Sequence, residues 1–241
     1  MPEVIDTRDI TYEIDGKTFT GYLADGSGGK SVPGVLVAHE GGGMTGHPKE
    51  RARMLAELGY VAFAMDTFGE AITSREQAMK ILGGLSADLP TLRKRANTAL
   101  DLLKAQKNVD AKRTAAIGFC FGGTTVLELA RSGADIGVVV GFHSGLGTSA
   151  PEDAKNIRAK VLVCLGAEDP IIPAEQRDAF IKEMQAGKVD WRMELYGGAG
   201  HSFTNREVDA MGLPGFAYHE ATDRRSWTAM RNAFDEVLGK I

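Results

Sequence analysis

Cysteine is scarce in this chain, with only Cys120 and Cys164 among 241 residues. There is no CxxC pair and no His/Cys grouping at zinc-ligand spacing, so neither a disulfide framework nor a metal site is expected. This cysteine usage favours a reducing, cytoplasmic location. No apolar run approaches the ~18 residues of a membrane span, and the start, MPEVIDTRDITYEIDG, lacks the pattern of a secretory signal. A membrane partner is therefore not expected.

Positive charge is not concentrated anywhere in the sequence. The formal net charge is −4, and the densest basic cluster, Arg93–Arg95, is interpreted as the solvated side of a helix. A nucleic-acid partner is thereby disfavoured. The composition, 43% hydrophobic and 25% charged with 30 glycines, is typical of a globular enzyme and excludes disordered, collagen-like and coiled-coil proteins. With no repeat and no linker, the length predicts one domain over residues 1–241.

Apolar strand-like runs alternate with amphipathic helical patterns along the chain. An antiparallel hairpin is predicted at Ile10–Ile14 and Thr18–Leu23. Further strands are predicted at Val35–His39, Tyr60–Asp66, Thr114–Gly118, Ile136–Phe142, Val161–Gly166 and Trp191–Tyr196, and helices at Pro48–Leu58, Leu89–Ala105, Thr124–Ala130, Glu175–Met184 and Asp223–Leu238. Continuously apolar strands are covered on both faces. We predict an α/β fold: a mostly parallel sheet of seven or eight strands, helices on both faces, and an antiparallel N-terminal edge.

The segment Gly118-Phe119-Cys120-Phe121-Gly122-Gly123 lies between a predicted strand and a predicted helix. This is the strand–turn–helix setting of a nucleophile elbow, with cysteine in the place of serine. Glycines two residues before and after Cys120 remove side chains that would collide in so sharp a turn. A helix N-terminus also favours a thiolate. Cys120 is therefore the predicted nucleophile; the alternative is a buried structural cysteine, which is how we interpret Cys164.

An acid and a base follow later strands. Asp169 comes just after Val161–Gly166, and His201 lies in a glycine-rich loop after Trp191–Tyr196. Taken alone, such an aspartate is more often a turn or capping residue, and such a histidine a surface residue. The order nucleophile, acid, histidine is the one that α/β-hydrolases use. We predict that His201 takes the thiol proton and that Asp169 orients and stabilises its imidazolium.

A glycine-rich segment, Gly41–Gly46, follows the first long strand and has two interpretations. It matches G-x-G-x-x-G, and Asp66 lies 20 residues further on, as in a dinucleotide-binding fingerprint. The following His-Pro-Lys-Glu-Arg lacks the small apolar residues that such a helix needs, and NAD binding would leave the elbow, the aspartate and the histidine unexplained. We favour an oxyanion loop in which the Gly41 N–H joins that of Phe121.

With these residues identified, the chain resembles the dienelactone hydrolase family over nearly its whole length. The matching features are His39-Glu40, Leu58-Gly59-Tyr60-Val61, GFCFGG at 118–123, the Gly166–Asp169 turn and Gly200-His201-Ser202-Phe203. The resemblance implies a Cys-His-Asp triad, no metal or organic cofactor, and hydrolysis through an acylated cysteine. It also implies that Glu40 takes part in the hydrogen bonding of the resting thiol, whose ionisation a nearby carboxylate opposes. The alternative for Glu40 is a solvated loop residue.

The sequence departs from the family pattern where a substrate carboxylate would bind. Family members that act on dienelactones use arginines, one of them four residues after the histidine; here that residue is Asn205, and Arg206 follows. We therefore expect a small, fairly apolar ester or lactone as the substrate. The residues predicted to edge its pocket are Phe68, Phe119, Phe121, His143, Phe203 and Arg206.

Three other functions remain open on the sequence alone. Hydrolysis of activated phosphotriesters or aryl esters by the same triad is the nearest alternative. An NAD-dependent oxidoreductase and a non-catalytic receptor built on the hydrolase fold are the others, since a fold does not determine a function. The protein is expected to be a monomer or a homodimer.

Overall fold

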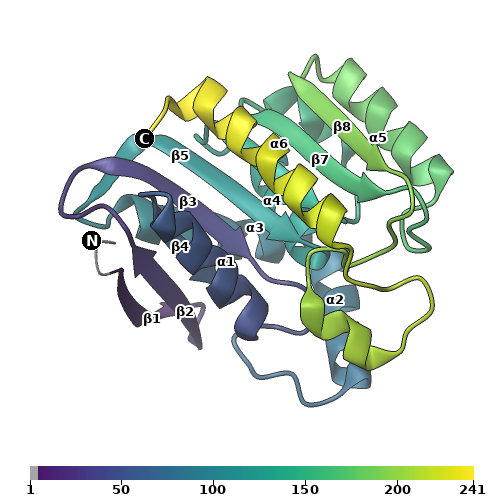
Figure 1. Cartoon of the computed structure of the whole chain (residues 1–241), viewed down its shortest axis with the longest axis horizontal. Coiled ribbons are helices and arrows are strands. Elements are labelled where there is room, and N and C mark those ends of the chain that lie inside the picture. The colour runs from purple at the N-terminus through teal and green to yellow at the C-terminus, as the bar shows by residue number, and fades with distance from the viewer. Residues whose placement is uncertain (1–4) are drawn as a thin grey trace.

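The computed structural model describes residues 5–241, which form one mixed sheet with helices packed on both faces (Figure 1). Its eight strands are β1 (Asp6–Ile14), β2 (Lys17–Asp25), β3 (Val32–Ala38), β4 (Val61–Met65), β5 (Val109–Phe119), β6 (Val138–Phe142), β7 (Lys160–Gly166) and β8 (Trp191–Tyr196). The helices are α1 (Gly46–Glu57), α2 (Arg75–Ala87), α3 (Leu89–Lys104), α4 (Phe121–Arg131), α5 (Ala174–Ala186) and α6 (Glu220–Leu238), with short 3-10 helices η1 (Pro151–Asn156) and η2 (Arg206–Met211). None of the helices in this described range is both long and apolar enough to cross a membrane.

The strand order is β1-β2-β4-β3-β5-β6-β7-β8. β1 and β2 pair antiparallel, β2 joins β4 antiparallel, and the pairs from β4 to β8 are parallel. The predicted α/β fold with an antiparallel N-terminal edge is confirmed. From β3 the chain runs to β4 on one side and later to β5 on the other. Ligands of open α/β sheets bind at such a switch point, outside the carboxyl ends of the strands.

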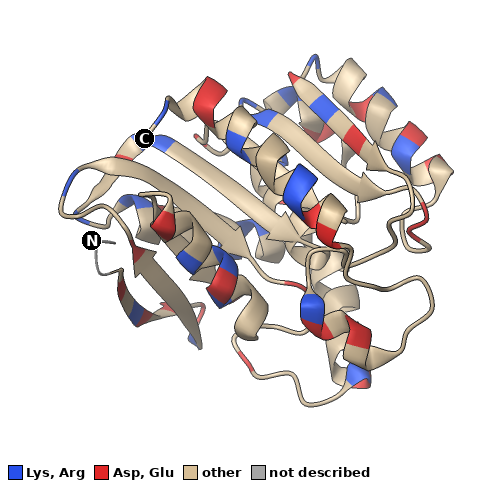
Figure 2. Ribbon diagram, in the orientation of Figure 1, with Lys and Arg blue, Asp and Glu red and all other residues tan. Residues whose placement is uncertain are grey.

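Alternation along the strands divides the core into two layers. On β3, Leu36 belongs to the core layer that includes residues of α3, α4 and α5, whereas Val35 and Val37 belong to the layer that includes residues of α1 and α6. This is why the central strands are apolar throughout: both of their faces are covered. Figure 2 shows charges of both signs interspersed along the helices, while the central strands are mostly uncharged.

Among the differences from the sequence prediction, two concern α2 and the start of β5. α2 was not predicted as a helix, because Gly83 and Gly84 lie in its interior and glycine is a poor helix former. Ser74 caps it by accepting a hydrogen bond from the Gln77 N–H. β5 begins at Val109 rather than Thr114, and its pairing with β3 shifts register between Pro33 and Gly34. That irregularity leaves no signal in the hydrophobic pattern.

Candidate active site

Cys120 lies between the last residue of β5 and the first residue of α4, in a strained backbone conformation. Its φ is 52° and its ψ is −117°, which is rare for a residue with a side chain. The chain can turn there because the neighbouring glycines have no Cβ: a Cβ on Gly118 would lie 2.0 Å from the Gly122 carbonyl oxygen, and one on Gly122 would lie 2.1 Å from the Ala38 oxygen. The turn leaves Cys120 partly exposed.

Strain is concentrated around this turn. Five described residues other than glycine have a positive φ, and three of them, Cys120, His143 and Ser202, lie at the carboxyl edge of the sheet. Cys164 differs: it is fully buried in β7, and burial raises the pKa of its thiol. The chain thus has one partly exposed thiol in a strained turn and one thiol enclosed in the core.

Asp169 and His201 come together from the loops after β7 and β8. His201 Nδ1 lies 2.7 Å from Asp169 Oδ2, and both side chains are buried. The second carboxylate oxygen, Oδ1, accepts a hydrogen bond from the Ile171 N–H at 2.8 Å. The two loops pack tightly, since a Cβ on Gly166 would lie 2.3 Å from the Ala199 oxygen. The aspartate is therefore held by the protein and orients the imidazole.

The surroundings of His201 favour its protonated form. Burial alone would lower its pKa, but hydrogen bonding and charge interactions with Asp169 and with the thiol of Cys120 outweigh burial and raise the pKa to about 10. The ring is thus placed between a carboxylate and a sulfur, the arrangement in which a thiolate–imidazolium pair forms.

The two predicted oxyanion donors, the N–H groups of Phe121 and Gly41, lie at the start of α4 and just after β3. Phe121 is the first residue of α4, and the first N–H groups of a helix have no acceptor within it. Gly41 follows β3, whose end contacts the elbow where Gly122 meets the Ala38 and His39 oxygens. The Cys120 N–H itself is occupied, since it donates to the Phe142 oxygen at 3.0 Å and to His143 Nδ1 at 3.1 Å. The oxyanion role of the Phe121 and Gly41 N–H groups stays a prediction.

Glu40 is mostly buried, with a side chain 14% exposed, so it is not a solvated loop residue. Its Oε2 accepts a hydrogen bond from Asn205 Nδ2 at 2.5 Å, and its Oε1 has no hydrogen-bond partner within residues 5–241. The hydrogen bond expected between Glu40 and the thiol is therefore not present in this structure. Burial raises the pKa of Glu40, opposed by hydrogen bonds from Asn205 and Ser202 and by the charge of His201.

The predicted pocket residues divide into two groups. Phe68 and Phe121 lie in the small apolar cluster against which Cys120 packs, with ring centroids 6.1 Å apart. Phe119 and Phe203 are fully buried in the core layer of α1 and α6, and Phe119 stacks on Phe142 at 4.9 Å. Phe68 is fully buried as well, so none of these three has exposed surface in this structure, and their place at the pocket edge stays a prediction.

His143 and Arg206 are the other predicted pocket residues. His143 is fully buried and contacts the Cys120 backbone. Arg206 is exposed, and its guanidinium lies over the Tyr218 ring at 4.1 Å from the centroid. The position four residues after His201 is held by Asn205, which binds the protein's own Glu40. In this structure the Arg206 guanidinium therefore contacts Tyr218, and its predicted role at the pocket stays a prediction.

α2, which sequence patterns left unassigned, covers the glycine-rich loop. A Cβ on Gly41 would lie 3.2 Å from Leu82, and Leu85 is buried beside Phe68 and Phe121. A surface pocket of about 480 Å³ lies beside the same loop, lined by Gly42, Met44, Asp66, Ile72 and neighbouring residues, and its lining includes neither Cys120 nor His201. The apolar side of α2 therefore faces the loop that follows β3.

A buried polar group around Arg51 was missed by sequence reasoning. His47 Nε2 accepts a hydrogen bond from Arg51 Nε at 3.2 Å, and Arg51 also binds the Thr204 carbonyl and Asp223. Burial and the charge of Arg51 lower the pKa of His47 to about 3, so it is neutral. These polar side chains fill the first turns of α1, where a dinucleotide-binding helix would need small apolar residues. Their partners come from distant segments, so no local pattern signals them.

Comparison with known proteins places this geometry in a family. Residues 19–238 match the model of the dienelactone hydrolase family. The chain therefore belongs to the dienelactone hydrolase family, within the α/β-hydrolase superfamily, and is a hydrolase of that type.

Individual relatives agree with this assignment. A solved structure named m3DLH is 50% identical, with a TM-score of 0.93 over 97% of this chain and 98% of the other. A dienelactone hydrolase-like promiscuous phosphotriesterase from metagenomic libraries is 41% identical, with a TM-score of 0.91 over the same shares. A Bradyrhizobium protein named "Probable 2-oxo-3-(5-oxofuran-2-ylidene)propanoate lactonase" is 30% identical over 208 residues, 81% of this chain and 83% of that one.

Proposed function

We propose that this protein hydrolyses small, uncharged carboxylic esters or lactones, with Cys120 as nucleophile, His201 as acid and base, and Asp169 as the residue that orients His201. The main support is one arrangement: a partly exposed thiol on a strained elbow at the N-terminus of α4, beside an imidazole that is bound to a buried carboxylate at 2.7 Å. A cysteine in a merely structural turn has no need of that partner.

In the first half-reaction the Cys120 thiolate attacks the carbonyl carbon, and the C=O π electrons move to the oxygen. The N–H groups of Phe121 and Gly41 stabilise that oxyanion; such a donor is worth ~10²–10³ in rate. When the C=O re-forms, the C–O bond to the leaving group breaks, and the His201 imidazolium donates its proton to the departing oxygen. The product is an acyl-cysteine, with the alcohol released or, for a lactone, still attached.

In the second half-reaction His201, now neutral, removes a proton from water as the water oxygen attacks the acyl carbon. The thiolate leaves when the tetrahedral intermediate collapses, and the imidazolium–thiolate pair is restored. Asp169 stabilises the imidazolium in both halves and remains ionised. Every step uses groups of this chain and water.

The charges around the site favour a neutral substrate. Asn205 stands where an arginine would bind a substrate carboxylate, and it is bonded to Glu40. Arg51 is buried and paired with Asp223 at 2.9 Å. A substrate carboxylate near Asn205 would therefore meet the Glu40 carboxyl group, and like charges in a buried setting repel strongly.

Ester turnover by Cys120→Ala tests the nucleophile. With a p-nitrophenyl ester series of increasing acyl length, we expect kcat/KM to fall by ~10³-fold or more, since removing a nucleophile leaves only binding and oxyanion stabilisation. Cys164→Ala is the matched control, because that thiol is enclosed in β7; it should keep its turnover despite some loss of stability. Unchanged turnover in Cys120→Ala would refute the proposal.

Phosphotriester hydrolysis is a second candidate, favoured by the 41% identical promiscuous phosphotriesterase. The Phe121 and Gly41 N–H groups would then stabilise a five-coordinate phosphorus centre as the thiolate displaces an aryloxide. We expect multiple turnovers of a p-nitrophenyl phosphotriester, lost in Cys120→Ala. Release of a single equivalent of p-nitrophenol, followed by inactivation, would rule out this activity.

A further inference from the structure

His143 is fully buried beside Cys120 and has a strained backbone, although the proposed function gives it no role as nucleophile, base or acid. It directly follows β6 with a φ of 40°, in the left-handed region, and its side chain is fully buried. Its Nδ1 lies 3.1 Å from the Cys120 backbone nitrogen, and its Nε2 lies 2.8 Å from Thr204 Oγ1. The ring thus bridges the elbow and the loop that carries His201, whose own ring is 5.2 Å away.

These contacts determine the proton position on His143. The Cys120 N–H is a donor, so Nδ1 must accept, and the ring proton then lies on Nε2 and is donated to Thr204 Oγ1. The Thr204 hydroxyl also lies 3.4 Å from His47 Nε2, which accepts from Arg51 Nε. Burial, together with the charges of His201 and Arg51, lowers the pKa of His143 well below its ordinary value. His143 is neutral, in the Nε2–H tautomer.

The segment after His143 is clamped at both sides. Thr124 Oγ1 donates to the Gly145 oxygen at 2.9 Å, and the Leu146 N–H donates to Gln176 Oε1 at 2.8 Å. The Leu146 oxygen accepts from Arg131 Nη2 at 2.9 Å. A strained backbone conformation persists only where the surrounding structure holds it in place. These three hydrogen bonds hold residues 145 and 146 and so help to maintain the positive φ of His143.

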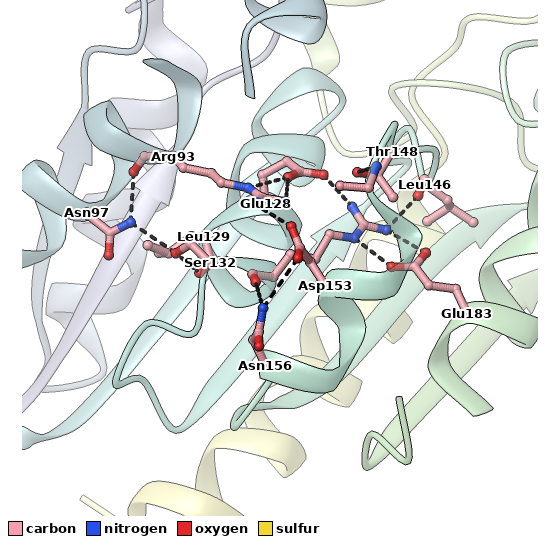
Figure 3. Close-up of polar contacts among 12 residues, drawn as sticks. Arg93, Asn97, Glu128, Leu129, Ser132, Leu146, Thr148, Asp153, Asn156 and Glu183 are labelled. Carbon is pink, nitrogen blue, oxygen red and sulfur yellow. Dashed lines mark hydrogen bonds and ion pairs between the residues drawn. The ribbon is translucent and has the colours of Figure 1, made fainter. Parts of the chain in front are cut away.

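Arg131 belongs to an ion-pair network, of which Figure 3 labels Arg93, Glu128, Asp153 and Glu183. It is fully buried and binds Glu128 at 2.9 Å and Glu183 at 2.7 Å. Glu128 also pairs with Arg93, which reaches Asp153 in η1. Through Arg131, the segment after His143 is therefore connected to α3, α4, α5 and η1.

We propose that His143 is a positioning residue for the nucleophile: its neutral, Nε2–H ring holds the Cys120 backbone in the strained conformation that directs the sulfur to His201. The proposal rests on the proposed function insofar as Cys120 is the nucleophile. Without the Nδ1 acceptor, the elbow would be held at the Cys120 N–H by the Phe142 oxygen alone. A displacement of about 1 Å in a reacting group can reduce a rate ~10²-fold.

Thr204→Val tests the orientation of the His143 ring with little change of shape. It removes the acceptor of the Nε2–H, and the ring loses the hydrogen bond that holds its Nδ1 against the Cys120 N–H. We expect the rate constant for alkylation of Cys120 by iodoacetamide, and kcat for esters, to fall ~10–100-fold with KM nearly unchanged. Thr204→Ser restores the hydroxyl and should rescue both rates. Equal alkylation rates in the Val and Ser variants would overturn the proposal.

Variants at His143 test the acceptor itself. His143→Asn places a carbonyl oxygen near the position of Nδ1, and asparagine tolerates the left-handed region; it should retain more of the alkylation rate than His143→Ala. Near-ultraviolet circular dichroism and the unfolding midpoint identify variants that misfold. A role in stability alone would lower the midpoint and leave the alkylation rate of the folded protein unchanged, which would contradict the proposal.

Nitrogen-15 correlation spectra of the unmodified protein provide a test independent of folding. The His143 ring should show its proton on Nε2 at neutral pH; a proton on Nδ1 would overturn the proposal. Alkylation also separates this inference from the proposed function. If Cys120→Ala still hydrolyses esters, the proposed function fails, whereas the dependence of Cys120 alkylation on Thr204 and His143 can still be measured.

Discussion

Two carboxyl groups interact with His201, and their surroundings give them different properties. Asp169 accepts hydrogen bonds at both oxygens, from His201 and from the Ile171 N–H, so its charge is compensated. Glu40 has one oxygen bonded to Asn205 and one buried without a partner, and burial raises its pKa. When two nearby carboxyl groups differ in their hydrogen-bond partners and burial, they can have different roles in a reaction. Asp169 has hydrogen-bond donors at both oxygens, whereas burial makes the charged form of Glu40 costly.

Replacing Glu40 by glutamine should therefore change stability in a pH-dependent way. Because the folded-state pKa of Glu40 is raised, its contribution to stability is fully present below its ordinary pKa and is lost as pH rises through the folded-state value. Glu40→Gln cannot ionise and avoids that loss. We expect the variant to be more stable than the parent at about pH 8, with the difference shrinking toward about pH 4.5, in urea unfolding.

The same variant should alkylate faster at Cys120 near neutral pH, because a carboxylate that opposes thiolate formation is gone. An unfolding difference that is constant with pH would show that Glu40 titrates normally.

At the scale of elements, glycine has opposite roles in α4 and α2. Gly122 lies in the first turn of α4, where an added Cβ would come within 2.1 Å of the Ala38 backbone oxygen. Gly83 lies in the exposed interior of α2, with nothing within 4 Å of an added Cβ. One glycine is required by close backbone approach, and the other only weakens its helix.

Alanine substitutions at these two positions should therefore have opposite signs. Gly122→Ala forces α4 away from the end of β3, and we expect a loss of about 1–3 kcal/mol or more in the free energy of unfolding together with loss of ester turnover. Gly83→Ala should raise the free energy of unfolding by about 0.5–1 kcal/mol, since glycine is the poorer helix former. Chemical unfolding measures both, and a stable, active Gly122→Ala would disprove the close approach at the elbow.

Across the whole molecule, one buried charge network connects the helices on the α4 face of the sheet. Arg131 is fully buried between Glu128 and Glu183, and the network continues through Arg93 to Asp153 (Figure 3). Buried pairs of this kind are costly to break from one side, because the remaining charge has no partner. The network therefore holds α3, α4, α5 and η1 in fixed relative positions.

Replacing one partner of that network should lower the free energy of unfolding more than replacing two partners together. Arg131→Met leaves the Glu183 carboxylate buried and unpaired, and we expect a loss of about 3–5 kcal/mol in the free energy of unfolding. Arg131→Met combined with Glu183→Met should recover much of that loss. An exposed pair is the control: Lys94→Ala, which breaks the contact with Asp15, should cost less than about 1 kcal/mol. Additive losses in the double variant would contradict this interpretation.

Features encoded over a few neighbouring residues could be predicted from the sequence. The apolar runs placed the central strands, although Tyr60–Asp66 shortens to β4 (Val61–Met65) and Ile136–Phe142 to β6 (Val138–Phe142). The glycines around Cys120 indicated a sharp turn, and the order of Cys120, Asp169 and His201 indicated the hydrolase class. Strand period, turn geometry and chain order are local properties, because they depend on backbone torsions and on which faces of an element are apolar.

Only the tertiary structure determined the contacts between segments that are far apart in the sequence. Asn205 binds Glu40 across 165 residues of chain, and Arg51 binds the Thr204 carbonyl across 153. No local sequence pattern distinguishes a buried histidine that contacts the elbow from one that lines a pocket. The contacts of His143 became known only from the structure, in which the end of β6 lies against the loop that carries His201. Burial and hydrogen-bond partners depend on how loops meet at the edge of the sheet, and that is determined by the packing of the whole chain.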